Sequence, residues 1–331
     1  MTNNNNITCK FCLSNNVIKH GDYKGIQRYL CNDCKRAFSA NDQLFKMRTP
    51  ANQVSSAVGM YYDGSSINAI RRHLQQEYNN NPSSKSVYKW IQKYTDEAIK
   101  DFKDYHPQVG DTWIADETVL SIGGQNIWMY DIIDRDTRFL LATRFTTSRT
   151  TKDAQILMER AERCAGKKPK VVVTDKNNSY LDGIEIAYGA DSEHIQSRPF
   201  ALENNTELIE RFHSTLKSRT KTMRDLKSID TAIQFIEGFL IHYNYLRPHE
   251  SLDGKTPAEV AKIDYSLKTW ADITRNAEPQ VKILVTPAVV ELVDEREPLV
   301  RPIAHRKAKP HRSRHVVHKD IVTSIGMSSL R

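Results

Sequence analysis

The sequence predicts a mixed α/β domain that follows a small metal-bound module and an all-α segment. Two Cys-x-x-Cys pairs lie within the first 34 of the 331 residues. Helical periodicity dominates residues 49–102, and from residue 111 onward apolar strand-like runs alternate with helical runs. A chain of this length has room for about two domains of ordinary size. The predicted class is therefore α/β, with two N-terminal modules.

The composition points to a polyanionic partner. The formal net charge is +8 and the isoelectric point is about 9.1. Residues 300–331 hold eight Lys or Arg against one Asp, so 8 − 1 = +7 of this excess lies in the C-terminal tail. No apolar run approaches the roughly 20 residues that span a bilayer, and the first residues show no signal pattern. We expect a soluble protein of the cell interior, cytoplasmic and associated with the nucleoid.

Residues 1–45 are predicted to form a zinc ribbon. Cys9 and Cys12 form one Cys-x-x-Cys pair, Cys31 and Cys34 form the other, and 18 residues separate the two pairs. Each pair brings two thiolates to one ion, and four thiolates suit one structural Zn²⁺. In so short a segment the metal supplies much of the folding free energy. Free thiols or redox chemistry are the alternative reading.

Residues 46–105 are predicted to form a helix-turn-helix domain. Good helix starts at Thr49-Pro50, at Ser65-Ser66 and at Pro82 divide the segment into three short helices. The third would be the recognition helix, with Val87, Trp90 and Ile91 packed inward. The side chains offered to a DNA groove are Ser84, Lys85, Ser86 and Lys89. A plain three-helix bundle would show the same periodicity.

After a linker at His106-Pro107, the order of the predicted elements is βββαβαβα. Three β-rich runs, 112–122, 126–134 and 138–146, form an antiparallel meander, and a helix over 150–166 ends at Gly166. A strand over 170–175, a helix over 179–188, a short strand near 194–196 and a long helix over 205–224 complete the order. With acids on the first and fourth strands, this order resembles the ribonuclease H-like fold.

Three acids of this domain are candidate ligands for divalent cations. Asp116 lies in the first strand, Asp175 ends the fourth strand, and Glu210 lies on the long helix. The first two acids have 58 residues between them, and the last two have 34 between them. Two Mg²⁺ or Mn²⁺ ions about 3.5–4 Å apart can activate one oxygen and stabilise another during phosphoryl transfer. Such ions take oxygen ligands, so three carboxylates from separate elements form a minimal site.

The motifs around these acids resemble the DDE transposases of prokaryotic insertion sequences. The runs WIADET, VVVTD and ERFHSTLKSRTKTMR are most similar to the insertion-sequence-six family and its archaeal relatives, from about Trp113 to Ala261. The resemblance implies that Asp116, Asp175 and Glu210 are the catalytic triad. It also implies binding of the element's terminal inverted repeats, cleavage there, and transfer of the freed strand to target DNA.

Other side chains of the long helix are assigned by spacing. Glu207 and Glu203 are rivals of Glu210, but only Glu210 keeps the 34-residue interval and the E-x-x-H-x-x-x-K frame. His213 is a possible active-site residue whose role stays undecided. Lys217 lies on nearly the same helix face as Glu210, near a phosphate at the metals. Candidate contacts to the DNA backbone are Lys217, Arg219, Lys221 and Arg224.

Several acids near Asp116 are left out of the site. Glu117 follows Asp116 and is expected to point to the other face of the strand. Asp131, Asp134 and Asp136 are expected to lie at a strand end or turn, where Asp commonly forms turns.

The predicted domains are 1–45, 46–105, 111–262 as the ribonuclease H-like DDE domain, and 263–331 as an extension with a basic, flexible tail. The expected partner is double-stranded DNA, and the handling of two element ends implies a homodimer or larger synaptic assembly. Two alternatives stay open: a non-catalytic DNA-binding regulator derived from a transposase, and a structure-selective nuclease of the same fold.

Overall fold

The computed structural model describes residues 7–9, 11–12, 14–23, 26–39, 47, 49–198, 204–223 and 226–276. The described residues fall into two compact units that divide between residues 50 and 51. The predicted basic tail and Glu203 lie outside the described residues.

The N-terminal unit is built on a three-stranded antiparallel sheet. Its strands are β1 (Val17–Tyr23), β2 (Ile26–Cys31) and β3 (Ala37–Ser39), in that order across the sheet. Among its described residues, the buried apolar core consists of Cys9, Cys31 and Phe38. Because so few apolar side chains are buried there, the unit needs another source of stability, as a metal-bound module would.

The second unit begins with the three predicted helices, α1 (Ala51–Tyr62), α2 (Ile67–Tyr78) and α3 (Ser84–Phe102). Serine hydroxyls cap two of them: Ser66 Oγ accepts from the Ala69 N–H (3.2 Å), and Ser83 Oγ accepts from the Ser86 N–H (3.1 Å). The apolar side chains of α3 that we expect to face inward are buried. The helix boundaries predicted from the caps are thus confirmed within a few residues.

A five-stranded sheet forms the centre of the second unit, and its strand order is β6-β5-β4-β7-β8. Strands β4, β5 and β6 are an antiparallel meander, while β7 and β8 run parallel to β4. The strand bounds are Thr112–Ile122, Gln125–Asp134, Leu140–Thr146, Val171–Thr174 and Glu193–Gln196 for β4 to β8. This topology is ribonuclease H-like, as predicted.

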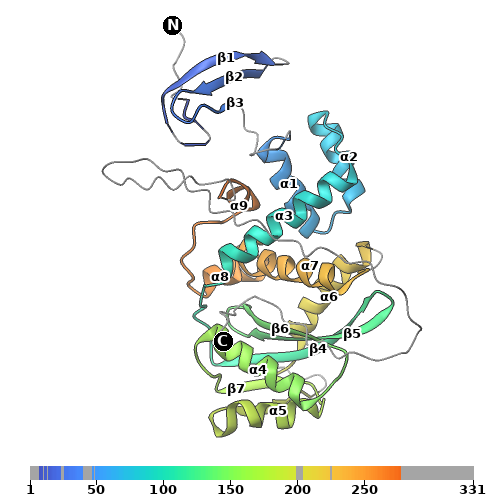
Figure 1. Cartoon of the computed structure of the whole chain (residues 1–331). Helices are drawn as coiled ribbons and strands as arrows, with labels where there is room; N and C mark the ends of the chain where they lie inside the picture. The colour runs from blue at the N-terminus through green and yellow to red at the C-terminus, as the bar shows by residue number, and fades with distance from the viewer. Residues whose placement is uncertain are drawn as a thin grey trace, which may run out of the picture. The chain divides into compact units, whose positions relative to one another are not determined.

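Four helices flank this sheet, with α4 and α5 on one side and α6 and α7 on the other (Figure 1). They span Thr151–Ala165, Ser179–Tyr188, Glu207–Met223 and Ile229–Ile241. The predicted βββαβαβα order is therefore confirmed. A π-helical turn (His242–Leu246), 3₁₀ turns (Gly189–Asp191 and Glu250–Leu252) and the short helices α8 (Pro257–Val260) and α9 (Trp270–Asn276) complete the unit.

Helices α1 and α3 pack directly on α7. A Cβ at Gly238 of α7 would lie 2.1 Å from Tyr62 Oη of α1 and 2.7 Å from Thr95 Cγ2 of α3, so glycine permits this close approach. The hydroxyls of Tyr62 and Thr95 share a buried hydrogen bond of 2.6 Å, and the Trp270 ring of α9 stacks on Tyr62. Residues 51–276 are thus held together by buried contacts. None of the described helices has the length and apolar character needed to cross a membrane.

Candidate active site and metal centres

Asp116 and Asp175 meet where β7 ends beside β4. The parallel pairing stops at Ala115 and Thr174, so the next residue of each strand is an aspartate. Carboxyl ends of adjacent parallel strands share one sheet edge, a common place for ligand sites. The Asn177 N–H donates to Asp175 Oδ1 (2.9 Å) and fixes one side of that carboxylate. Two of the three predicted acids are therefore brought together.

Glu117 joins this pair, contrary to the prediction. Carboxylate oxygens of Asp116, Glu117 and Asp175 all lie within 4.8 Å of one another. Successive strand residues do face opposite sides of a sheet. However, β7 ends at Thr174. Residues 116 and 117 of β4 therefore have no paired strand on the β7 side. The side chains of Asp116 and Glu117 therefore reach the same space around the open edge. We call these three residues the acid cluster.

The chemistry of the acid cluster fits a divalent cation. Glu117 Oε2 is buried and has no hydrogen-bond partner among the described residues. Burial, and then the neighbouring carboxylates, raise the pKa of both Glu117 and Asp175. A buried carboxylate oxygen without a donor, beside two further carboxylates, is a costly arrangement that a bound cation relieves. Hard cations such as Mg²⁺ prefer oxygen ligands of this kind.

His213 of α6 connects the acid cluster to Asp131. Like Glu117, Asp131 was left out of the predicted metal site. His213 Nε2 donates to Asp131 Oδ2 (2.9 Å), and its Nδ1 lies 3.5 Å from Asp116 Oδ2. Asp131 is fully buried in the middle of β5, paired with Asp116, and not in a turn. Burial alone would lower the pKa of His213, but the two carboxylates outweigh it and raise that pKa to about 9. The two carboxylates favour the protonated form of His213, and the imidazole links Asp131 to Asp116.

Asp134 and Asp136 were expected at a strand end or turn, and they lie there. Asp134 is the last residue of β5, and its Oδ2 accepts from the Thr137 N–H (2.8 Å). The turn assignment predicted for Asp131 is wrong, since its side chain serves His213. The two-residue Gly123-Gly124 hairpin fixes the register of β4 and β5, so the pairing of Asp116 with Asp131 was a signal available in the sequence.

A cation that sequence reasoning missed, Arg149, pairs with Glu117. Its guanidinium also lies 4.3 Å from the centre of the Trp128 ring. Asn177 Nδ2 donates to the same Glu117 oxygen (2.9 Å). Arg149 and Asn177 therefore hold one oxygen of Glu117, and its second oxygen has no hydrogen-bond partner among the described residues.

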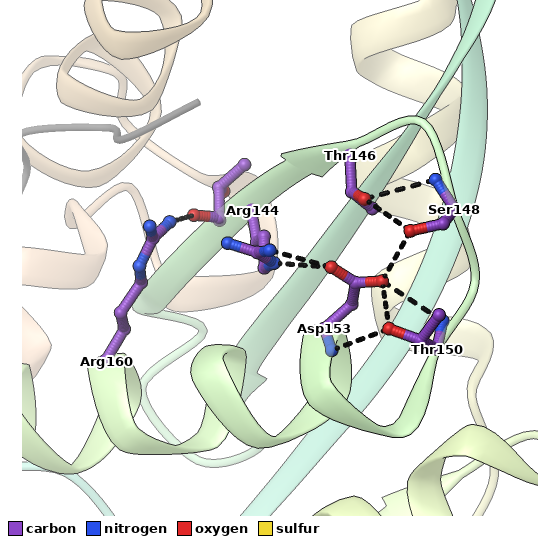
Figure 2. Close-up of polar contacts among 7 residues, drawn as sticks. Arg144, Thr146, Ser148, Thr150, Asp153 and Arg160 are labelled. Carbon is purple, nitrogen blue, oxygen red and sulfur yellow. Dashed lines mark hydrogen bonds and ion pairs between the residues drawn. The ribbon is translucent and has the colours of Figure 1, made fainter. Parts of the chain in front are cut away.

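The loop that carries Arg149 is fixed by Asp153 (Figure 2). Asp153 Oδ2 accepts from the Ser148 hydroxyl (3.1 Å) and from the Thr150 hydroxyl (2.6 Å), and so holds both neighbours of Arg149. Asp153 Oδ1 accepts from Arg144 Nε and Nη2 (2.9 and 2.7 Å), in an ion pair whose side chains are only 5% and 4% exposed. Thr150 and Asp153 also form the capping box of α4.

Glu210, the third predicted acid, lies on α6 but outside the acid cluster. Its side chain is exposed, and the Thr206 hydroxyl donates to its Oε1 (2.7 Å). It precedes His213 by three residues, so it lies on the same helix face as the imidazole that contacts Asp116. Helix α6 thus places Glu210 within one turn of the site, and the structure does not bring its carboxylate into contact with the other two.

The predicted cations of α6 have two different environments. Lys217 and Lys221 are exposed, as a contact to DNA requires. Arg219 is only 3% exposed, with its guanidinium 4.2 Å from the centre of the Tyr61 ring. Arg219 is therefore not exposed like the other predicted DNA-contacting cations, because α6 packs this face against α1 and α7. Arg224 lies outside the described residues.

The predicted groove-facing side chains at the start of α3 are accessible. Ser84, Lys85 and Lys89 are exposed and Ser86 is half-buried, while Val87 and Ile91 are buried on the opposite face. A recognition helix needs such an exposed polar face and a buried apolar face. A helix of a plain three-helix bundle has the same two faces.

The four N-terminal cysteines converge as predicted. Sulfur atoms of Cys9, Cys12, Cys31 and Cys34 all lie within 4.8 Å of one another, with Cys9–Cys34 at 3.6 Å and Cys12–Cys31 at 3.5 Å. Tetrahedral Zn–S bonds of about 2.3 Å require sulfur separations of roughly 3.8 Å, so the arrangement fits one zinc ion. The Phe11 N–H donates to Cys9 Sγ (3.4 Å). Cys164, the fifth cysteine, is not part of this group and is buried in α4.

Comparison with known proteins finds a family match within the second unit. A family model described as a DDE domain, of the IS240 transposase type, matches residues 110–249. An uncharacterized protein of Methanocaldococcus jannaschii is 26% identical over 62% of this chain and 92% of its own length. An uncharacterized protein in transposable element ISH50 of Halobacterium salinarum is 34% identical over 27% of this chain and 30% of its own length.

Solved structures show weak similarity. The HTLV-2 integrase catalytic core domain in complex with magnesium aligns with a TM-score of 0.38 and 16% identity, over 47% of this chain and 99% of that one. The simian T-cell lymphotropic virus intasome in complex with PP2A regulatory subunit B56 gamma aligns with a TM-score of 0.35 and 12% identity, over 70% of this chain and 80% of that one. The fold assignment rests on the strand order, and the family on the DDE domain match and the transposable-element relative. Residues 110–249 thus match a DDE domain, and this match together with the transposable-element relative supports a DDE transposase of insertion sequences.

Proposed function

We propose that this protein is a DNA transposase that cuts DNA at the ends of its element and joins the freed 3′-hydroxyl to target DNA. The observation that carries the proposal is the meeting of Asp116 and Asp175 at one open sheet edge within a DDE domain. Phosphoryl transfer requires positioning and charge stabilisation more than covalent chemistry from the protein. A group of carboxylates at a sheet edge supplies both.

Asp116, Asp175 and Glu210 are proposed as the catalytic acids, and Glu117 as a further ligand. Divalent ions such as Mg²⁺ or Mn²⁺, when bound, would supply Lewis-acid stabilisation of the oxygens that attack and leave. His213, anchored on Asp131, keeps the Asp116 carboxylate in place. Glu210 is one helical turn from His213, and rotation of its exposed side chain away from Thr206 would turn it toward the acid cluster.

The remaining parts of the chain are proposed to hold DNA. The exposed side chains Ser84, Lys85 and Lys89 of α3 and Lys217 and Lys221 of α6 suit contacts to bases and phosphates. The zinc-bound ribbon and α1–α3 would read the terminal inverted repeats. Because two ends must be held at once, we expect a homodimer or larger assembly acting on double-stranded DNA in the cytoplasm.

The test is metal-dependent nicking and strand transfer on DNA that contains the element ends, taken from the flanks of the coding sequence. We expect both products from the full chain with Mg²⁺, and a loss of more than about 100-fold in Asp175→Asn and in Glu210→Gln. Full activity of either variant would reject its assigned residue. Specific DNA binding without any cleavage would instead indicate a regulator, and cleavage of junctions without strand transfer would indicate a structure-selective nuclease.

A further inference from the structure

A cavity of about 830 Å³ lies among α1, α2, α3, α6 and α7, away from the acid cluster. Three helices begin at its wall: α2 with Ser66 to Asn68, α3 with Ser84, and α7 with its cap Ser228. Each helix is at least 12 residues long. The unpaired N–H groups of a helix N-terminus favour anions, and here three such termini face one space.

Arg219 lines this cavity. Its guanidinium provides five N–H donors, and Nη1 donates to the Thr222 hydroxyl (2.6 Å). Nε and Nη2 are buried and have no hydrogen-bond partner among the described residues. No carboxylate of the described residues forms an ion pair with Arg219. A buried cation without a counter-charge is costly, so the site is built for an anion.

The rest of the wall agrees with this charge. Lys227 adds a second cation, and none of the described residues that line the cavity is acidic. Hydroxyl and amide side chains, including Thr222, Thr231 and Gln234, provide further hydrogen-bonding groups. Tyr61, Tyr88 and Phe235 provide aromatic surface beside Arg219, on which a base or sugar can pack.

The cavity also has a defined place relative to the acid cluster. Arg219 follows His213 by six residues on α6, which corresponds to about 9 Å along the helix. That length spans between two and three base-pair steps at roughly 3.4 Å each. The exposed Lys217 lies between the two along the helix, and Ser84 in the first turn of α3 also lines the cavity. A DNA strand bound along α6 would therefore have a backbone phosphate within about this distance of the acid cluster.

We propose that this cavity is a phosphate-binding site that holds a backbone phosphate of a DNA strand bound along α6. This proposal rests on the proposed function for the DNA, while the phosphate chemistry rests on Arg219 and the three helix N-termini alone. A free nucleotide would satisfy the same chemistry, so the test separates the two sources.

The first arm uses the full chain and inorganic phosphate. Phosphate that binds only the folded protein raises its melting temperature relative to chloride at equal ionic strength. We expect this rise in the wild type and in Gln108→Glu, an exposed amide-to-carboxylate control that does not line the cavity. We expect it to be lost in Arg219→Gln, which keeps a donor for Thr222, and in Asn68→Glu. Asn68 is exposed in the first turn of α2, where a carboxylate is compatible with the helix but repels phosphate.

The second arm measures binding of a labelled duplex that carries the element end, as a function of salt. We expect Arg219→Gln and Asn68→Glu to weaken binding by about tenfold or more, because a charged hydrogen-bonded contact is lost. Arg219→Gln should also reduce the slope of log K against log salt by about 0.9, the contribution of one phosphate. Gln108→Glu should match the wild type in affinity and in slope. If Arg219→Gln does not fold, the phosphate and duplex binding of Asn68→Glu decides whether the cavity holds a DNA phosphate.

Unchanged phosphate and DNA binding in Arg219→Gln and Asn68→Glu would overturn the proposal. A phosphate effect that depends on Arg219, with wild-type DNA affinity in both variants, would overturn the assignment to DNA in favour of a free phosphate or nucleotide. If the wild type binds no DNA, the proposed function fails, and the melting temperatures in phosphate still decide whether the cavity binds phosphate.

Discussion

At the scale of single residues, the site depends on how each carboxylate is held. Asp116 is held by His213, Asp175 by the Asn177 N–H, and Glu117 by Arg149 and Asn177. Each acid thus has a fixed side and a side free for a ligand. Glu210 has only the Thr206 hydroxyl and is the least constrained of the four. Its position in the structure agrees with a ligand that is recruited when metal and DNA bind.

The role of Glu117 leads to a prediction about metal affinity. Glu117→Gln removes one charge from the acid cluster and weakens the pairing with Arg149, so we expect the affinity for Mn²⁺ to fall by about 10–100-fold. Calorimetric titration of the zinc-loaded protein with Mn²⁺ measures the change. Glu185→Gln, an exposed carboxylate of α5, is the matched control. Wild-type Mn²⁺ affinity in Glu117→Gln would remove Glu117 from the site.

A second residue-scale prediction concerns pH. Burial lowers the pKa of His249 to about 4, and its Nε2 donates to the Tyr243 carbonyl (3.0 Å). The folded state therefore binds this proton less tightly than the unfolded state, whose histidine has a pKa near 6.5. Between about pH 6.5 and pH 4 the unfolded state holds more protons, so stability falls as the pH falls.

His249→Gln keeps a donor for Tyr243 but does not titrate in this range. We expect the variant to lose less stability than the wild type between pH 7 and pH 4, by on the order of 2 kcal/mol after allowance for solvent screening. Urea unfolding at each pH measures the difference. Parallel stability curves for the two proteins would show that His249 titrates normally in the folded state.

At the scale of elements, the junction between β6 and α4 sets the position of Arg149. Asp153→Ala leaves the Arg144 guanidinium buried without its carboxylate, and it removes the capping box of α4. We expect a loss of about 3–5 kcal/mol in the free energy of unfolding. Asp182→Asn, at an exposed position of α5, should change stability by less than about 0.5 kcal/mol. Denaturant unfolding compares the two, and a small effect at Asp153 would mean that the ion pair does not stabilise this junction.

The elements themselves were predictable because their signals are local. Ser66, Ser83 and Gly166 mark helix ends by capping chemistry, and Gly166 has the expected left-handed conformation (φ 66°). The apolar runs of β4 to β7 were visible as strands, and their order identified the fold. The sequence was enough to group Asp116 with Asp175 in one site. In the structure each of them directly follows the last pair of residues, Ala115 and Thr174, between β4 and β7.

The remaining features of the site depend on contacts that are distant in sequence. The place of Glu117 depends on β7 ending at Thr174, and strand alternation alone predicts the opposite result. Arg219 was expected on a surface because helix spacing shows which residues share a face and not what that face packs against. Its burial depends on Tyr61, which lies 158 residues earlier in the chain. His213 was undecided for the same reason, since its anchor Asp131 comes from another element.

At the scale of the whole molecule, the two compact units have different sources of stability. The described part of residues 7–39 buries few apolar side chains, whereas residues 51–276 share a large core. Removal of zinc by a chelator should therefore unfold the N-terminal module and leave the second unit folded.

Limited proteolysis after chelation should yield a resistant fragment that begins near residue 51, and zinc should restore the intact chain. Cys31→Ser should show the same cleavage without a chelator. Resistance of residues 7–39 in the zinc-free protein would contradict a metal-dependent fold. Loss of both units in one transition would contradict their independence.

The central claim is that the carboxylates at the β4 and β7 edge catalyse DNA strand transfer. Joining of a labelled element end to plasmid DNA under single-turnover conditions tests it most directly, with the wild type and Asp116→Asn each assayed with and without Mg²⁺. We expect a joined product only from the wild type with Mg²⁺, and a loss of more than about 100-fold in Asp116→Asn with the DNA affinity retained. Joining by Asp116→Asn at the wild-type rate, or by the wild type without a divalent cation, would contradict it.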